Sequence, residues 1–175
     1  CKCISKLLGG YASGMLAEIL SWRSSQLEAI LFDIDGTLSD VTHRLHFIEN
    51  GKNQWGLFFK EIPNDPPIEP IVGIARTLIR SNDKAVLFAS GRPEYTRKDT
   101  VAWLLKHQIE VDFETRLFMR KDGDQRADHI VKREILDHIR NAGFEPVLVF
   151  DDRQSVVDMW RDQGIRVAQT APGNF

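Results

Sequence analysis

The stretch Glu28-Ala-Ile-Leu-Phe-Asp33-Ile-Asp35-Gly36-Thr-Leu-Ser39 largely decides the fold of this 175-residue chain. Its apolar start, residues 29–32, is typical of a buried β-strand and ends in two carboxylates separated by one residue. Because alternate residues of a strand share a face, Asp33 and Asp35 begin on the same side, and Gly36 predicts a tight turn after them. At the carboxyl end of a strand in an open α/β sheet, such side chains point into the crevice that binds ligands.

The rest of the chain alternates strand-like runs with segments of helical periodicity. In residues 68–81 the apolar positions recur at intervals of three and four, which predicts a helix. The same reasoning predicts strands at residues 84–89, 117–119, 146–150 and 165–168, and helices at residues 95–107, 128–141 and 153–162. Such alternation indicates βαβ units around a mostly parallel sheet. We therefore expect residues 29–175 to form one α/β domain, a three-layer sandwich whose central parallel sheet is covered by helices on both faces.

Residues 41–67 interrupt this alternation between the first strand and the next helix, and they carry the aromatic side chains of Trp55, Phe58 and Phe59. An insert at this place lies beside the Asp33 crevice, so we predict that it forms a small cap. Aromatic rings here could stack a nucleobase, an interaction of about 1–3 kcal/mol per base in proteins that bind single strands. Packing of at least two of these rings against the core is the simpler alternative, and the sequence leaves both open.

Composition limits the functions that fit this chain. A formal net charge of −2 gives no general attraction to nucleic acid or to a membrane surface, so a polyanion would have to meet a local basic patch. Cys1 and Cys3 lie at the extreme amino end, cannot cross-link the domain, and favour a cytoplasmic location. Residues 4–22 are apolar, but glycines and a glutamate interrupt them before the roughly 20 apolar residues of a membrane span. We expect residues 1–28 to be a linker or a short amphipathic helix, without membrane association.

Residues that suit phosphate binding follow the second predicted strand. Residues 86–89 lead into Ser90-Gly91-Arg92-Pro93, and we expect Pro93 to open the next helix because proline is favoured in the first helical turn. The Ser90 hydroxyl and the backbone amides of Gly91 and Arg92 would then face one spot together with the positive end of the helix, an arrangement that suits a phosphate dianion. A simple helix cap is the alternative role for Ser90.

Two further groups of charged residues complete the predicted site. Lys132 lies four residues after Asp128 on one predicted helix, so the two share a face. Alone this spacing indicates a surface ion pair, but at the crevice Lys132 would balance the carboxylates and bind phosphate. Another predicted strand ends in the pair Asp151-Asp152, whose charges repel each other. A magnesium ion held by Asp33 and one of this pair would remove the repulsion and neutralise a substrate phosphate.

In order and in placement, Asp33, Ser90, Lys132 and Asp151-Asp152 resemble the four motifs of the haloacid dehalogenase (HAD) superfamily of phosphotransferases. Within that superfamily, the chain from about residue 29 onward resembles the 3′-phosphatase domains of phage polynucleotide kinases and their stand-alone phage and bacterial relatives. The stretch Asp-Asp-Arg-Gln-Ser-Val-Val-Asp-Met-Trp at 151–160 is the most specific part of the resemblance. The sequence contains no Gly-x-x-x-x-Gly-Lys-Ser/Thr phosphate loop, so the kinase half of those proteins has no counterpart in it.

The resemblance implies an HAD fold, a Mg²⁺ cofactor and a mechanism through an aspartyl-phosphate. It implies that Asp33 is the nucleophile, that Asp35 is the general acid and then the base, and that Lys132 is a catalytic phosphate ligand. The residues implied to bind or surround the substrate are Thr37, Arg44, Ser90, Gly91, Arg92, Arg120 and Asp128. Those considered for the metal are Asp33, Asp35, Asp151 and Asp152, with Asp152 preferred over its neighbour.

We therefore predict a Mg²⁺-dependent phosphomonoester hydrolase whose substrate is a phosphorylated nucleic-acid end, most specifically a polynucleotide 3′-phosphate. A nucleotidase or other small-metabolite phosphatase on the same scaffold is the alternative, because the insert after Asp40 differs from the corresponding stretch of the phage kinases. A catalytically silent module that binds nucleic-acid ends is a more remote alternative.

Overall fold

The computed structural model describes residues 26–173 of the chain. Cys1, Cys3 and almost all of the linker or helix predicted at residues 1–28 lie outside the described residues, as do the last two residues. Within the described part, no helix is both long enough and apolar enough to cross a membrane.

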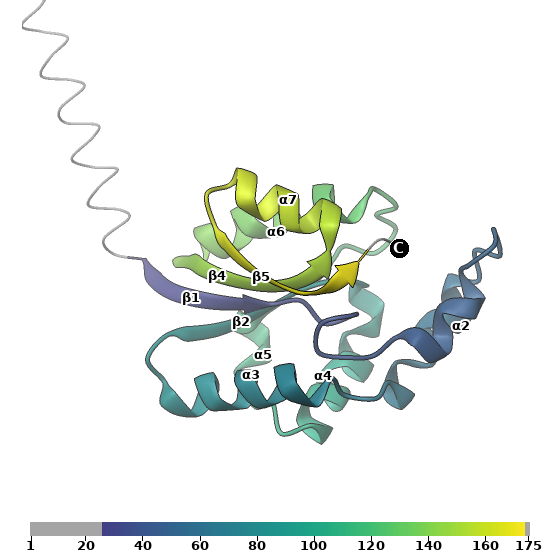
Figure 1. Cartoon of the computed structure of the whole chain (residues 1–175), viewed down its shortest axis with the longest axis horizontal. Coiled ribbons are helices and arrows are strands. Elements are labelled where there is room, and N and C mark those ends of the chain that lie inside the picture. Colours follow the sequence, from purple (N-terminus) through teal and green to yellow (C-terminus); the bar gives the residue numbers. More distant parts are fainter. Residues whose placement is uncertain (1–25, 174–175) are drawn as a thin grey trace, which may run out of the picture.

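A parallel sheet of five strands forms the centre of the molecule (Figure 1). Its order is β3-β2-β1-β4-β5, so that β1 lies in the middle with β2 and β4 as its neighbours. Every strand pairs in parallel with the next, which confirms the predicted central sheet. The strands are β1 (Leu27–Phe32), β2 (Ala85–Pro93), β3 (Leu117–Arg120), β4 (Phe144–Arg153) and β5 (Arg166–Gly173).

Helices cover both faces of the sheet and complete the three predicted layers. On one face lie α3 (Glu69–Ser81), α4 (Arg97–Lys106) and the short α5 (Phe113–Arg116), and on the other lie α6 (Asp128–Asn141) and α7 (Gln154–Asp162) (Figure 1). The α/β sandwich expected from the alternating pattern is therefore confirmed.

The connection from β2 to α4 differs from the prediction. β2 continues through Pro93, whose partner in β3 is Arg120. A 3-10 turn, η3 (Glu94–Thr96), follows before α4 begins at Arg97. Pro93 has a ψ of 152°, an extended value that suits the end of a strand and not the first turn of a helix. The segment from Ser90 to Pro93 is therefore part of the strand, and the helix begins later than expected.

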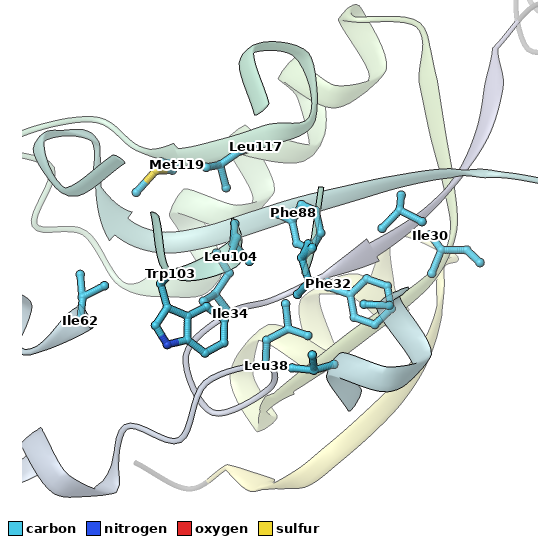
Figure 2. Close-up of a cluster of buried hydrophobic side chains, with 14 residues drawn as sticks. Ile30, Phe32, Ile34, Leu38, Ile62, Phe88, Trp103, Leu104, Leu117 and Met119 are labelled. Atoms are coloured by element: carbon cyan, nitrogen blue, oxygen red, sulfur yellow. The ribbon is translucent and has the colours of Figure 1, made fainter. Parts of the chain in front are cut away.

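Two hydrophobic clusters lie on opposite faces of the sheet, and β1 contributes alternately to both. Ile30 and Phe32 belong to one cluster (Figure 2), whereas Ala29 and Leu31 belong to the other. The ring of Phe32 stacks on that of Phe150 in β4, with centroids 4.6 Å apart and planes 2° from parallel. Because helices cover both faces, the central strands are continuous apolar runs without alternating polar residues.

A one-residue irregularity in β4 sets its alignment with β1. Ala29 pairs with Pro146 but Ile30 pairs with Leu148, so Val147 is the extra residue of a bulge. Proline has no N–H for the strand ladder and is confined in sheets to edges, strand starts and bulges, which accounts for the irregularity beside Pro146. Beyond the bulge the two strands stay in register to the end of β1.

The insert at residues 41–67 folds into short helical turns. In order these are η1 (Thr42–Phe47), α2 (Trp55–Lys60) and η2 (Ile62–Asn64), and α2 lies to one side of the sandwich in Figure 1. The buried side chains of Phe58 and Ile62 hold the insert to the domain. The indole N–H of Trp103 in α4 donates to the carbonyl of Asp65 at 2.8 Å. The insert is thus anchored to the domain, and its role as a cap stays a prediction.

Two leucines of β1 test the packing of the sheet. Leu31 is 0% exposed and Leu27 is 64% exposed. We expect Leu31→Ala to lower the free energy of unfolding by about 2–5 kcal/mol, because it removes buried methyl groups and leaves a cavity. The matched change Leu27→Ala should alter it by less than about 0.5 kcal/mol. Urea denaturation followed by circular dichroism measures both, and equal losses would contradict the burial described for β1.

Candidate active site

The functional side chains gather where the carboxyl ends of β1, β2 and β4 meet. Asp33 follows β1 directly and is buried, and its backbone N–H donates to the carbonyl of Phe150 in β4 at 2.9 Å. A cavity of about 380 Å³ lies at this place. Carboxylates of Asp33, Asp35, Asp128 and Asp152 line it, together with apolar side chains of the insert. This is the crevice expected at the strand ends of an open α/β sheet.

Lys132 is the buried cation of the site. Its Nζ, carried by α6, donates to Asp33 Oδ1 at 2.7 Å and to Asp151 Oδ2 at 2.9 Å, and it lies 3.7 Å from Asp128 Oδ2. Burial alone would lower the lysine pKa, but the charges of Asp151 and Asp33 outweigh it and raise the pKa well above its ordinary value. The amine is therefore a charged ammonium at neutral pH, and it binds Asp33, which follows β1, and Asp151, which lies in β4.

Asp33, Asp151 and Asp152 form a compact cluster of buried carboxylates. One oxygen from each lies within 4.8 Å of the others. Burial and the neighbouring carboxylates raise the pKa of Asp33 well above its ordinary value, although Lys132 acts to lower it. Burial together with the charge of Asp151 raises the pKa of Asp152 to about 6. The cluster therefore holds more negative charge than the single lysine neutralises.

The same three carboxylates fit a hard divalent cation such as Mg²⁺. Carboxylate oxygens are its usual protein ligands, and a cation would relieve the repulsion that raises the pKa of Asp33 and Asp152. Asp152 Oδ2 is buried and has no hydrogen-bond partner among residues 26–173. Gly36, at a φ of +83°, leaves this atom its space, because a Cβ there would lie 2.3 Å from it. Asp33, Asp151 and Asp152 are thus the residues that would hold the metal.

Asp35 lies outside this cluster of carboxylates, although the sequence places it among the candidate metal ligands. Its Oδ1 accepts hydrogen bonds from Arg44 Nη2 and from Arg92 Nε, each at 2.8 Å, and from the Ser39 hydroxyl at 3.2 Å. Burial would raise the pKa of Asp35, but Arg92 and Arg44 outweigh it and lower the pKa to about 2. Asp35 is therefore ionised at neutral pH and bound to two guanidinium groups. A general acid needs the protonated form, so this arrangement supplies the base form of Asp35 and not the acid form.

Asp65, which has no role in the sequence-based prediction, binds the same two arginines. It is buried and accepts hydrogen bonds from Arg44 Nε and Nη2, both at 2.7 Å, and from Arg92 Nη2 at 2.9 Å. Two carboxylates and two guanidinium groups thus form one network, made of Asp35, Asp65, Arg44 and Arg92. No pattern in the sequence indicates this network, because the resemblance implies that Arg44 and Arg92 bind substrate and it gives no role to Asp65.

The arginines predicted near the substrate separate into two kinds. Arg44 and Arg92 are completely buried, do not line the cavity, and hold Asp35 in place. Arg120 does line the cavity, donating from Nε to the Gly91 carbonyl at 2.8 Å and from Nη2 to Asp128 Oδ1 at 3.1 Å. The structure therefore places only Arg120 of these three where a ligand could meet it.

The predicted phosphate-binding segment is similarly divided. Gly91 lines the cavity, and a Cβ there would lie 2.4 Å from Asp128 Oδ1, so the position has no room for a side chain. Ser90 is completely buried, and its hydroxyl accepts the backbone N–H two residues later at 3.3 Å. Thr37 is also buried, with its hydroxyl 3.5 Å from Asp152 Oδ1. Ser90 and Thr37 thus lie behind the residues that line the cavity.

Comparison with known proteins identifies the family that the sequence of this chain matches. Residues 27–175 match the family described as the polynucleotide kinase PNKP phosphatase domain. A protein of Autographa californica nuclear polyhedrosis virus, named as a bifunctional polynucleotide kinase/RNA ligase, is 27% identical over 134 residues. The match covers 77% of this chain and 18% of the viral protein, so the chain corresponds to a small part of that relative.

Solved structures show the same fold. A chain of the Pnkp1/Rnl/Hen1 RNA repair complex has a TM-score of 0.70 and 29% identity, over 86% of this chain and 44% of that one. The class C acid phosphatase from Bacillus anthracis has a TM-score of 0.61 and 16% identity, over 95% of this chain and 76% of that one. An HAD hydrolase from Entamoeba histolytica has a TM-score of 0.60 and 12% identity, over 81% of this chain and 82% of that one. These last two likenesses show the fold alone, and they confirm the HAD-like fold.

The acid–arginine network can be tested through Asp65. We expect Asp65→Asn to lower the free energy of unfolding by about 3–5 kcal/mol, because removing one partner of a buried ion pair leaves charge uncompensated. Urea denaturation measures the loss. Asp83→Asn, at an aspartate whose side chain is 79% exposed, is the control and should change stability by less than about 0.5 kcal/mol. If Asp65→Asn is no more costly than this control, Asp35 alone neutralises both arginines.

Proposed function

The chain belongs to the polynucleotide kinase PNKP phosphatase domain family, and from this we propose that it is a Mg²⁺-dependent phosphatase that removes the phosphate from the 3′ end of a nucleic-acid strand. The observation that carries the proposal is the buried ion pair of Asp33, which lines the cavity, with Lys132 behind it, and with Asp151 and Asp152 in the same cluster. A nucleophilic carboxylate, a fixed ammonium and a set of metal-binding oxygens are the parts that phosphoryl transfer needs.

Asp33 is the proposed nucleophile. In the first step its carboxylate oxygen forms a bond to phosphorus while the bond from phosphorus to the substrate oxygen breaks, and the released oxygen takes up a proton. In the second step water attacks the aspartyl-phosphate, gives up a proton, and releases inorganic phosphate with Asp33 restored. Lys132 donates a hydrogen bond to Asp33 Oδ1 at 2.7 Å, and this contact fixes the orientation of the Asp33 carboxylate.

Lys132 and the cavity wall support this attack. The Lys132 ammonium offsets the negative charge of the phosphoryl oxygens, an effect that is strong in a site with little water. Asp151 and Asp128 hold that ammonium in place. When bound, Mg²⁺ would act as a Lewis acid that neutralises further phosphate charge.

Asp35 serves the second step in this proposal. Its ionised state, held by Arg44 and Arg92, suits a base that takes the proton of the attacking water. Protonation of the released substrate oxygen in the first step requires the acid form of the same carboxyl group. That role stays a prediction from the sequence, because it requires the two arginines to loosen their hold.

The family description and the names of the relatives support a nucleic-acid end as the substrate over other phosphate esters. The 3′ position rests on the resemblance of the sequence to the 3′-phosphatase domains of polynucleotide kinases. Removal of a 3′-phosphate leaves a 3′-hydroxyl, which is the group that strand joining consumes. We therefore place the reaction before a joining step, in line with the ligase named among the relatives.

The nucleophile is tested by Asp33→Asn, a nearly isosteric change. With a 3′-phosphorylated oligonucleotide as substrate, phosphate release should fall by roughly 10³-fold or more, because removal of a catalytic nucleophile has effects of this size or larger. Asp83→Asn, the exposed control, should retain full activity. Activity of Asp33→Asn within tenfold of wild type would rule out the covalent mechanism.

The same assay distinguishes the proposed substrate from the alternative. We expect a higher kcat/KM for the oligonucleotide than for a 3′-mononucleotide, with an oligonucleotide preference that weakens as salt is added, since phosphate contacts release counterions. Equal values for the two substrates, independent of salt, would favour a nucleotidase. If the protein hydrolyses neither the oligonucleotide nor the mononucleotide, the proposed function is wrong.

The metal is tested by chelation and by thermal unfolding. Excess chelator should abolish phosphate release, Mg²⁺ should restore it, and Ca²⁺ should restore it poorly because its coordination shell is larger and looser. Mg²⁺ should also raise the melting temperature of the wild type, because binding to the folded state stabilises it. Asp152→Asn should abolish this rise. A melting temperature that is unaffected by Mg²⁺ in the wild type would contradict the proposed site.

A further inference from the structure

The wall of the cavity that the insert supplies is mostly apolar and carries three aromatic rings. Apart from Glu49, the cavity-lining side chains of residues 41–67 are Val41, Leu45, Ile48, Trp55, Phe58 and Phe59. The phosphatase chemistry proposed above uses none of them. A phosphate group alone has no use for such a wall, so its presence indicates that the rest of the ligand carries an apolar, planar surface.

Trp55 is the exposed member of this wall. It is 48% exposed although its ring lies beside that of Phe59, with centroids 5.8 Å apart and planes 27° from parallel. It also meets the edge of Phe58, at 5.6 Å and 79°. An indole with this much open surface, supported by two other rings, can receive a planar ligand without rearranging.

The support beneath Trp55 is fixed. Phe58 is buried, and the guanidinium carbon of Arg44 lies 4.0 Å from the centre of its ring. Arg44 is itself held by Asp35 and Asp65. The aromatic wall and the carboxylates of the site are therefore connected through one buried arginine, which keeps the wall at a constant place relative to Asp35.

We propose that Trp55 stacks the terminal nucleobase of the substrate while its phosphate lies at Asp33, a conclusion that rests on the proposed function. In a 3′-terminal nucleotide, one sugar links the phosphate to a planar base. In the cavity, the Asp33 carboxylate held by Lys132 and the exposed indole of Trp55 belong to the same lining. Every base has a π face, so stacking selects for the presence of a base and not for its identity. Sugar phosphates and abasic ends lack the group that Trp55 binds.

The experiment compares two 3′-phosphorylated oligonucleotides of the same length, one with a normal terminal nucleotide and one with an abasic terminal sugar. The protein variants are wild type, Trp55→Ala, Trp55→Phe and Leu57→Ala. Leu57 is the matched control because it lies on the same helix, is 43% exposed and is not among the residues that line the cavity. Melting temperatures of all variants show whether each is folded.

On the normal substrate, Trp55→Ala should raise KM roughly 5- to 100-fold with little change in kcat, which is the size of effect that stacking one base on an aromatic side chain produces. Trp55→Phe should recover most of the loss, and Leu57→Ala should match wild type. On the abasic substrate, wild type should already show the raised KM, and Trp55→Ala should raise it no further.

Two outcomes overturn the subsite. One is equal KM for the normal and abasic substrates in wild type, and the other is an equal effect of Trp55→Ala on both. Either result leaves the 3′-phosphatase activity intact, because both substrates are still hydrolysed. Failure of the proposed function is recognised separately, since wild type would then release phosphate from neither oligonucleotide.

Discussion

The buried ammonium of Lys132 is the interaction on which the rest of the site depends. An unpaired ammonium or carboxylate in the interior is strongly destabilising, so the elements that carry them have to meet. Lys132 lies on α6. Its partner Asp33 directly follows β1, and its other partner Asp151 lies in β4. The indole N–H of Trp160 in α7 adds a hydrogen bond to Asp151 at 3.1 Å. Ion pairs and hydrogen bonds therefore hold β1, β4, α6 and α7 together at one end of the sandwich, and apolar packing holds its middle together.

Strand endings made much of this site predictable. Asp33 and Asp151 each follow an apolar run, and parallel strands bring their carboxyl ends to the same edge of the sheet, so their nearness follows from the pattern. The helical spacing of Asp128 and Lys132 likewise places the lysine on the same face as its neighbour. Asp35 shows where this reasoning ends. It lines the same cavity as Asp33, as the spacing predicts, but no strand pattern indicates that its carboxylate binds Arg44 and Arg92.

The insert was the part that the sequence could not resolve. Residues 41–67 have neither a helical nor a strand period, so no pattern indicates that Arg44 turns inward or that Asp65 comes to meet it. Their pairing depends on the path of the chain through space. In the structure that path makes the insert part of the site, because Arg44 contacts the ring of Phe58 on one side and the carboxylate of Asp35 on another. The insert cannot be displaced as a rigid body without disturbing Asp35.

The bulge at Val147 has a consequence for how such a chain can diverge. Side chains alternate between the faces of a strand, so a shift of one residue sends each of them to the opposite face. Because Val147 is the extra residue of the bulge, deleting it would leave a regular ladder in which Ala29 still pairs with Pro146 and Ile30 still pairs with Leu148. An insertion or deletion between Leu148 and Asp151 would instead shift Asp151 and Asp152 relative to Asp33 and separate Lys132 from its partner. Descendants of this sequence are therefore free to change β4 at the bulge, whereas a change of length between Leu148 and Asp151 would disrupt the site.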